Sequence, residues 1–394
     1  MERLPPSAPR SSIELLGRIL DVRPSDSASA ALRLAFFAPK FSWQELIDFA
    51  NAHQLLPAVI WSLRRRALLL PLPASLDPRL REAHVTQRLT KVFEQHLRLQ
   101  NDLRDQLLAI VGAFNQAGVI PLLLKGARHL LTQEDWWVAR GMRDLDIMVM
   151  PDQADRARDI LAALGYRPDY AAELEGQHHL PQMRREGWNG AVEIHIALLA
   201  FNGAHLMSAE KAWAFSKPGE VEGRQFRILP PAWHVLHGLL HHQVVDRGYQ
   251  RRLLALKGLW EFSIGTNALS SDDVAAIADH MDKHGSLDVL AGWIVQAHLV
   301  FGLPIPDNVA VSDKARANAQ ATLARADWPY GLRRALYIAD QLRFAFSPET
   351  LALRYRSRGA GSKVGMAARH LGFLGRKYRS GALSRIFGSK DRIS

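Results

Sequence analysis

Two aspartates, Asp144 and Asp146, lie one residue apart in the apolar run MRDLDIMVM, residues 142–150. This run is typical of a buried β-strand, in which alternate side chains share a face, so the two carboxylates should point the same way. Two like charges that close together resist burial unless a cation lies between them. Because hard oxygen ligands favour Mg²⁺ or Mn²⁺, the pair indicates a divalent metal site.

A second interpretation of the pair is a solvent-facing strand edge on which Arg140 and Arg143 neutralise the aspartates. Glu193 favours the metal site over this interpretation. It lies in AVEIHIAL, residues 191–198, whose alternating pattern predicts another strand. Three carboxylates on two neighbouring strands are typical of metal-assisted phosphoryl or nucleotidyl transfer.

The segment LLLKGARHLL, residues 122–131, predicts a short buried strand, a turn at Lys125 and Gly126, and then a helix. Backbone N–H groups at the start of such a helix, together with the charges of Lys125 and Arg128, are suited to bind phosphates. The alternative is a purely structural turn, in which glycine is needed for its backbone freedom.

The segments LLLKGARHLL, RGMRDLDIMVM, LAALGYRP and VEIHIAL together resemble the uncharacterised nucleotidyltransferase family of the DNA polymerase β-like superfamily. The resemblance covers residues 121–198 and implies an α+β fold, with a small mixed β-sheet core flanked by N-terminal and C-terminal helical regions. The metal ligands that it implies are Asp144, Asp146 and Glu193. The residues expected to receive the nucleotide are Lys125, Gly126, Arg128 and Arg143.

Four further residues bear on this resemblance. Ala127 stands where members of the superfamily often have a serine that touches the triphosphate. The segment TQEDWWVARG is expected to bring Arg140 or Arg143 near the phosphates, unless the two arginines simply pair with the aspartates. His195, which shares a face with Glu193, is expected to be a wall residue of the site.

The elements around these motifs divide the chain into four regions. Helical patterns fill residues 1–117, with a capping-box spacing from Ser42 to Glu45 and a long stripe from about residue 79 to 116. Residues 118–228 form the predicted α/β core. Residues 229–347 read as helices at 230–247, 251–265, 271–283, 286–302 and 328–347, and residues 348–394 form a basic tail.

Composition limits the possible classes of protein. The 394-residue chain has no cysteine, which excludes disulfides, thiolate metal sites and cysteine nucleophiles. It offers no apolar stretch long enough to span a membrane, and its first residues do not form a secretory signal, so we expect a cytoplasmic protein. From Leu351 to Ser394 the chain carries eleven Lys and Arg residues against one acid. This segment is suited to an anionic membrane, to a nucleic acid, or to neither if it is simply solvated.

Four histidines, His234, His237, His241 and His242, recur along one predicted helix. His237 and His241 are spaced as metal ligands on a helix can be. Since the chain has no H-E-x-x-H motif, we expect packing or substrate contact rather than a zinc site.

The sequence therefore predicts a two-metal, Mg²⁺-dependent enzyme that moves a nucleoside monophosphate from an NTP to an acceptor and releases pyrophosphate, with the two ions bridged by Asp144 and Asp146. The acceptor stays open between a small molecule, a sugar phosphate, a protein and RNA. The alternative is a catalytically idle nucleotide-binding or scaffold protein that acts through its basic C-terminal region. Removing Asp146 is expected to abolish transfer and to leave the melting temperature unchanged or higher, since one of two repelling charges is lost.

Overall fold

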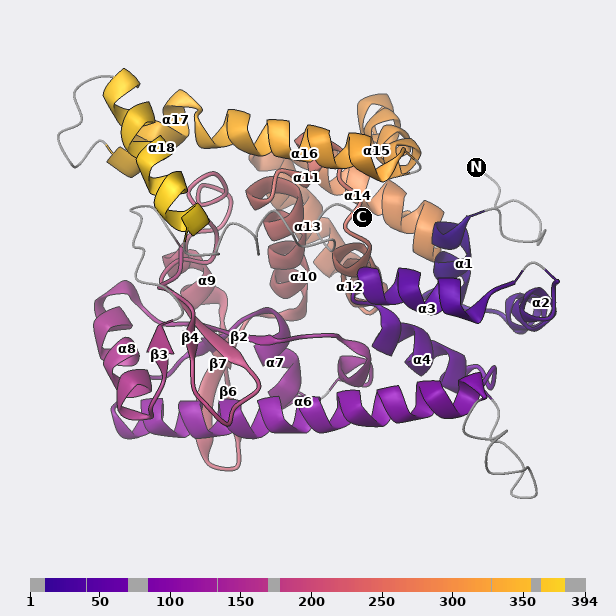
Figure 1. The fold of residues 1–394 in the computed structure, drawn as a ribbon, viewed down its shortest axis with the longest axis horizontal. Coiled ribbons are helices and arrows are strands. Elements are labelled where there is room, and N and C mark those ends of the chain that lie inside the picture. The colour runs from indigo at the N-terminus through magenta and orange to yellow at the C-terminus, as the bar shows by residue number, and fades with distance from the viewer. Residues whose placement is uncertain are drawn as a thin grey trace.

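The computed structural model describes residues 11–39, 41–69, 84–132, 134–168, 178–326, 328–355 and 363–379. Residues 1–10, where the sequence predicts no secretory signal, lie outside this range, as do parts of the basic segment. Most of the described chain is helical, and one mixed sheet lies among the helices (Figure 1). This arrangement confirms the predicted α+β fold.

Within the described ranges, the sheet has seven strands. They are β1 (Leu122–Leu123), β2 (Asp144–Met148), β3 (Arg167–Pro168), β4 (Met183–Arg184), β5 (Ala191–His195), β6 (Lys217–Val221) and β7 (Arg224–Ile228). Their order is β3-β4-β5-β2-β1-β7-β6. The two predicted acid-bearing strands, β2 and β5, are neighbours and run parallel, while β1 pairs with β2 on its other side in the antiparallel sense. An exposed edge position for β2 is therefore excluded.

The long helix α6 (Val85–Gln116) extends from the sheet to the N-terminal helices, as Figure 1 shows along its lower side. Gln106, buried in this helix, donates from Nε2 to the Tyr166 hydroxyl at 2.9 Å and to the Gly190 carbonyl at 2.8 Å. Its Oε1 accepts from the Gly190 N–H at 2.9 Å. A Cβ at position 190 would overlap Leu103 and Gln106, so glycine allows the start of β5 to approach the helix closely.

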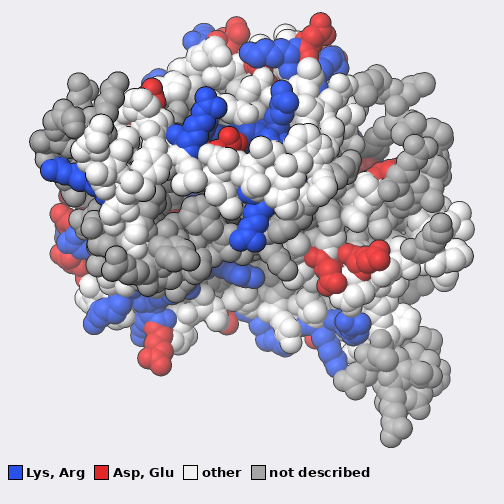
Figure 2. Space-filling model, turned by 45° about the horizontal axis from the view of Figure 1, so that its top comes forward, with Lys and Arg blue, Asp and Glu red and all other residues white. Residues whose placement is uncertain are grey.

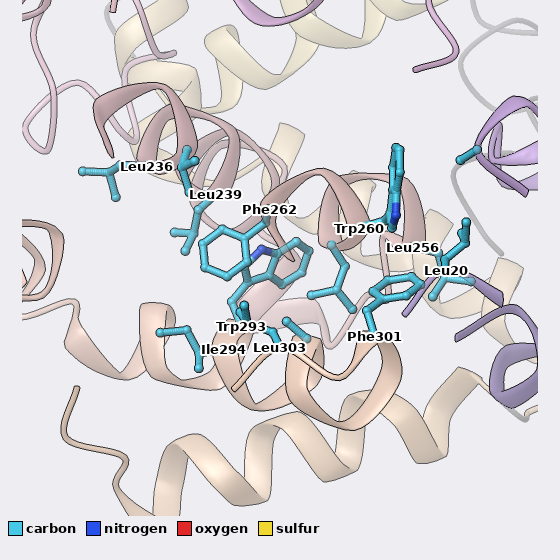
Figure 3. Close-up of a cluster of buried hydrophobic side chains, with 14 of the residues drawn as sticks. Leu20, Leu236, Leu239, Leu256, Trp260, Phe262, Trp293, Ile294, Phe301 and Leu303 are labelled. Atoms are coloured by element: carbon cyan, nitrogen blue, oxygen red, sulfur yellow. The ribbon is translucent and has the colours of Figure 1, made fainter. Parts of the chain in front are cut away.

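Helices from both ends of the chain share one hydrophobic core. The N-terminal helices are α1 (Ser12–Ile19), α2 (Asp26–Phe36), α3 (Trp43–Ala52) and α4 (Leu56–Arg65). Ser42 caps α3 as predicted, by accepting from the Glu45 N–H. The C-terminal helices are α10 (Pro231–Leu240), α11 (Gly248–Arg251), α12 (Leu256–Asn267), α13 (Ser271–Lys283), α14 (Leu287–Phe301), α15 (Asp313–Ala326) and α16 (Tyr330–Ala345). Phe262 of α12 packs edge-on against Trp293 of α14 in this core, to which Trp260 of α12 also belongs (Figure 3).

The remaining described elements are mostly short. They are α7 (Lys125–Thr132), the 3₁₀ turns η1 (Trp137–Ala139) and η2 (Pro151–Gln153), α8 (Ala154–Ala163), α9 (Ala209–Phe215), the π-turn η3 (His241–Val245), α17 (Pro348–Tyr355) and α18 (Lys363–Arg379). The last two cover part of the basic segment, and the Tyr355 hydroxyl lies 3.0 Å from His370 Nδ1 between them. Contact of this segment with membrane or nucleic acid stays a prediction. Among the described helices, none has the length and apolar character that crossing a membrane requires.

Some elements differ from the sequence-based expectation. The hairpin of β6 and β7 was not predicted, because Pro218 and Gly219 weaken the strand pattern of β6. Both residues are tolerated here, since β6 lies at the edge of the sheet. The helix α15 was not predicted at all. The predicted helix 230–247 stops being α-helical after Leu240, and β5 ends at His195 rather than at residue 198. The division of the chain at residues 117, 228 and 347 stays a prediction.

Candidate functional site

The carboxylates predicted from the sequence meet at the centre of the sheet. In the parallel pairing of β2 with β5, Asp146 is the register partner of Glu193. Asp144 lies two residues before Asp146 on the same face, and His195 lies two residues beyond Glu193. The Asp146 side chain is only 2% exposed, whereas that of Glu193 is 20% exposed. The sheet therefore presents three acids and one imidazole on one face.

Asp146 is held by two neighbours. Lys125 Nζ and His195 Nε2 each lie 2.9 Å from its Oδ1. Burial alone would raise the pKa of Asp146, but the Lys125 ammonium and the His195 hydrogen bond outweigh burial and hold this pKa well below its usual value. Asp146 is therefore ionised although it is buried.

Lys125 begins α7 directly after β1, with a left-handed φ of 43°. Non-glycine residues rarely adopt this conformation, and here it turns the chain sharply from strand to helix. Burial would lower the pKa of Lys125, but the charges of Asp146, Asp144 and Glu193 raise it above the ordinary value. The ammonium thus remains charged and already serves as a cation beside the aspartate pair.

The residues on this face fit a divalent metal ion. One ligand atom each from Asp146, Glu193 and His195 lies within 4.8 Å of the other two. Gln182 Nε2 donates to Glu193 Oε1 at 3.1 Å, which orients that carboxylate. Asp144 stands outside this close group but lines the cavity beside Asp146. Carboxylate oxygens are the ligands that Mg²⁺ and Mn²⁺ prefer.

A cavity of about 390 Å³ opens beside Asp144 and Asp146. Its other walls come from the link between α3 and α4, from α10 with η3, and from α11, α12, α15 and α16. The cations on its lining are Lys125, Arg140, Arg251, Arg252, Lys257, Arg325 and Arg333. Figure 2, in which the top of Figure 1 comes forward, also shows lysine and arginine side chains over the middle of that face. The cavity is thus acidic on the sheet side and mainly basic on the helical side.

Arg140 and two residues of α12 form a charged group on the cavity wall. Arg140 Nε lies 3.1 Å from Glu261 Oε1, and Lys257 Nζ lies 4.0 Å from the same oxygen. Burial, together with the charge of Arg140, lowers the pKa of Lys257 to about 8. Arg140 therefore lines the cavity, and its ion-pair partner is Glu261 rather than an aspartate of β2. Its contact with phosphates stays a prediction.

The structure brings together only some of the residues expected to bind nucleotide. Lys125 lines the cavity, whereas Arg128 and Arg143 do not. Arg128 is buried and pairs with Glu134 at 2.6 Å, and Arg143 is exposed. Gly126 packs so closely under Arg140 that a Cβ would overlap its guanidinium. The glycine therefore makes room for the arginine.

Lys257 and Glu261 line the cavity but were not among the residues predicted from the sequence. These residues lie four positions apart on α12, between Leu256, Leu259 and Trp260, which are all buried. A charged pair at this spacing on an otherwise apolar helix is the signal that was available.

The four histidines near α10 also reach this region. All of them line the cavity, and His237 is fully buried. Burial, with the nearby charge of Lys125, lowers the pKa of His237 well below its usual value, so this ring is neutral.

The chain was compared with known proteins and with family models. No curated protein matches the chain. A family model described as an uncharacterised nucleotidyltransferase matches residues 39–302. This range includes the helices α3 and α4, the sheet, and the part of the cavity wall that is formed by α10 to α12. The chain belongs to this uncharacterised nucleotidyltransferase family.

Proposed function

We propose that the protein transfers a nucleoside monophosphate from an NTP to an acceptor, with a divalent metal ion held by Asp144, Asp146 and Glu193. The observation that carries this proposal is the register pairing of Asp146 with Glu193 beside a cavity whose other walls are basic. An acidic face suits metal ions, and basic walls suit the charge of a triphosphate.

Magnesium is the ion that these ligands favour, and Mn²⁺ is the substitute. When bound, such an ion would supply positive charge to the phosphate oxygens and lower the pKa of an attacking hydroxyl. Asp146 already attracts the Lys125 ammonium at 2.9 Å, which supports its capacity to hold a cation.

The reaction joins an acceptor oxygen to the α-phosphorus and breaks the bond from that phosphorus to the bridging oxygen of pyrophosphate. Pyrophosphate leaves with the electron pair of the broken bond. We propose that Glu193, which is partly exposed and is the register partner of Asp146, takes the acceptor's proton. Lys125, Arg140 and Lys257 line the cavity and would offset the negative charge of the phosphates.

The acceptor is proposed only by class. Arg251, Arg252, Arg325 and Arg333 add positive charge to the walls formed by α11, α15 and α16. This charge favours an acceptor that itself carries phosphate or carboxylate groups.

The test begins with thermal stabilisation of the full chain by each NTP, with and without Mg²⁺. Pyrophosphate release is then measured with phosphorylated and unphosphorylated acceptors, and with the protein itself as acceptor. Transfer that requires Mg²⁺ and is absent in Asp146→Ala supports the proposal. Stabilisation by Mg²⁺ and NTP without release from any acceptor would instead favour the idle nucleotide-binding alternative.

A further inference from the structure

A second group of possible metal ligands lies on the cavity wall formed by η3 and its C-terminal end, on a different element from the carboxylates of β2 and β5. It consists of His241, His242 and Asp246, and one ligand atom from each lies within 4.8 Å of the other two. All three residues line the cavity. Contrary to the expectation from the sequence, we propose that these side chains bind a zinc-class divalent ion and leave its fourth position open to the cavity.

The distances within this group suit an ion at its centre. Asp246 Oδ2 lies 3.4 Å from His241 Nδ1 and 3.8 Å from His242 Nδ1. Both distances exceed the range of about 2.7–3.2 Å that is usual for an N–H···O hydrogen bond. In a tetrahedral zinc site with bonds of about 2.0–2.1 Å, neighbouring ligand atoms lie about 3.4 Å apart. The spacing is therefore closer to that of ligands around an ion than to that of directly bonded pairs.

A π-turn brings the three residues together. The Asp246 N–H donates to the His241 carbonyl at 2.9 Å, a bond that spans five residues instead of the four of an α-helix. This wider turn allows Asp246 to lie next to two consecutive histidines, whereas an α-helix aligns a residue mainly with the third and fourth before it. Arg247 then takes a left-handed φ of 58°, and η3 ends. π-turns are rare and frequently mark functional sites.

The neighbours of His242 fix the direction of its ring. A Cβ at Gly258 of α12 would overlap His242 Nε2 and Cδ2, so only a glycine lets the ring lie there. Trp293 stacks against the same ring, with ring centroids 6.3 Å apart and planes inclined by 22°. The ring is thus packed with its Nε2 edge against α12, while Nδ1 is the atom close to Asp246.

The donor set separates this site from the carboxylate site. Two imidazoles and one carboxylate favour Zn²⁺ and similar borderline ions, whereas Asp144, Asp146 and Glu193 favour Mg²⁺. Three protein ligands with one open position are the pattern of catalytic rather than structural zinc sites. The proposal does not depend on nucleotidyl transfer, so each of the two can fail without the other.

The test is zinc binding by the untagged full chain. After removal of metal with a chelator, Zn²⁺ is titrated in competition with a chromophoric chelator, and Co²⁺ is used as a spectroscopic probe. We expect one tight equivalent of zinc and the strong visible absorption of tetrahedral cobalt. Asp246→Asn, which keeps the shape of a half-exposed side chain, should weaken zinc binding at least about tenfold, as removal of one ligand should.

Two further variants decide the assignment. His241→Gln removes a second ligand and should weaken zinc binding in the same way, even if Asp246→Asn does not fold. Asp144→Asn alters the carboxylate site and should leave zinc affinity unchanged. A wild-type chain without stoichiometric zinc, or undiminished binding in both ligand variants, overturns the proposal. So does a loss of zinc confined to Asp144→Asn.

Discussion

The two sides of the cavity are built in different ways. On the sheet side, Asp144 and Asp146 line the cavity from β2, and the register of β2 with β5 brings Glu193 next to Asp146. On the helical side, residues such as Lys257 and Arg333 come from helices far apart in the chain. The acidic residues can therefore be recognised from the alternating pattern of the strands in the sequence. The basic residues come together only when the helices pack against one another.

The largest expected effect is on the sheet side. Asp146→Ala should reduce transfer at least about a thousandfold, because a ligand of the proposed metal site is lost. Activity is measured as Mg²⁺-dependent pyrophosphate release, with the exposed Asp282→Ala as a control. Retained activity would remove Asp146 from the site.

The same variant should also be less stable. The sequence alone favours an unchanged or higher melting temperature, because it shows only the repulsion between Asp144 and Asp146. The structure reverses this expectation, since Asp146 is buried and paired with Lys125. Removal of Asp146 should cost about 1–3 kcal/mol of unfolding free energy. The cost is limited because Lys125, the partner that is left behind, is 22% exposed and keeps some contact with water.

A second test concerns the support of the sheet side by α6. Gln106→Leu should lower the unfolding free energy by about 2–4 kcal/mol, because it leaves the Gly190 backbone groups and the Tyr166 hydroxyl buried without these partners. Urea unfolding measures the loss. Asn101→Leu, at an exposed position of the same helix, is the matched control, and an equal effect in both would contradict the role of Gln106.

The helical side should respond to pH through Lys257, whose pKa is about 8. Its charge is present below this value and lost above it, so kcat/KM for the NTP should fall about tenfold from pH 7 to pH 9. Lys257→Arg keeps its charge and should flatten this decline, whereas Lys257→Met should be slow at both pH values. An identical profile in wild type and Lys257→Arg would exclude Lys257 from nucleotide binding.

The smallest expected effect is on stability in mild acid. Burial, with the charge of Arg333, lowers the pKa of His53 to about 4 from its model-peptide value of 6.5. Below pH 6.5 the unfolded chain therefore binds this proton more readily than the folded chain. His53 should cost about 1 kcal/mol of unfolding free energy between pH 7 and pH 5.5. His53→Gln should lose less stability over this range in urea titrations, and an unchanged pH dependence would contradict the assignment.

The contacts within one strand could be predicted from the sequence, whereas the contacts between distant elements could not. The period of two in a strand put Asp144 and Asp146 on one face and Arg143 on the other, whereas the position of Glu193 beside Asp146 also requires the pairing of β2 with β5. The partner of Asp146 is Lys125, which lies 21 residues earlier, and that contact arises only from the pairing of β1 with β2. Arg140 and Glu261 meet across more than a hundred residues, so no local pattern could pair them.

Helix α6 contributes to both hydrophobic cores of the molecule. Its first half, with Leu89 and Phe93, belongs to the core of the helical regions, and its second half, with Leu107 and Phe114, belongs to the core under the sheet. A fragment that begins at Gly118 would expose the apolar side of the sheet to water. Neither core can be complete without this helix, so we expect the two to melt in a single transition.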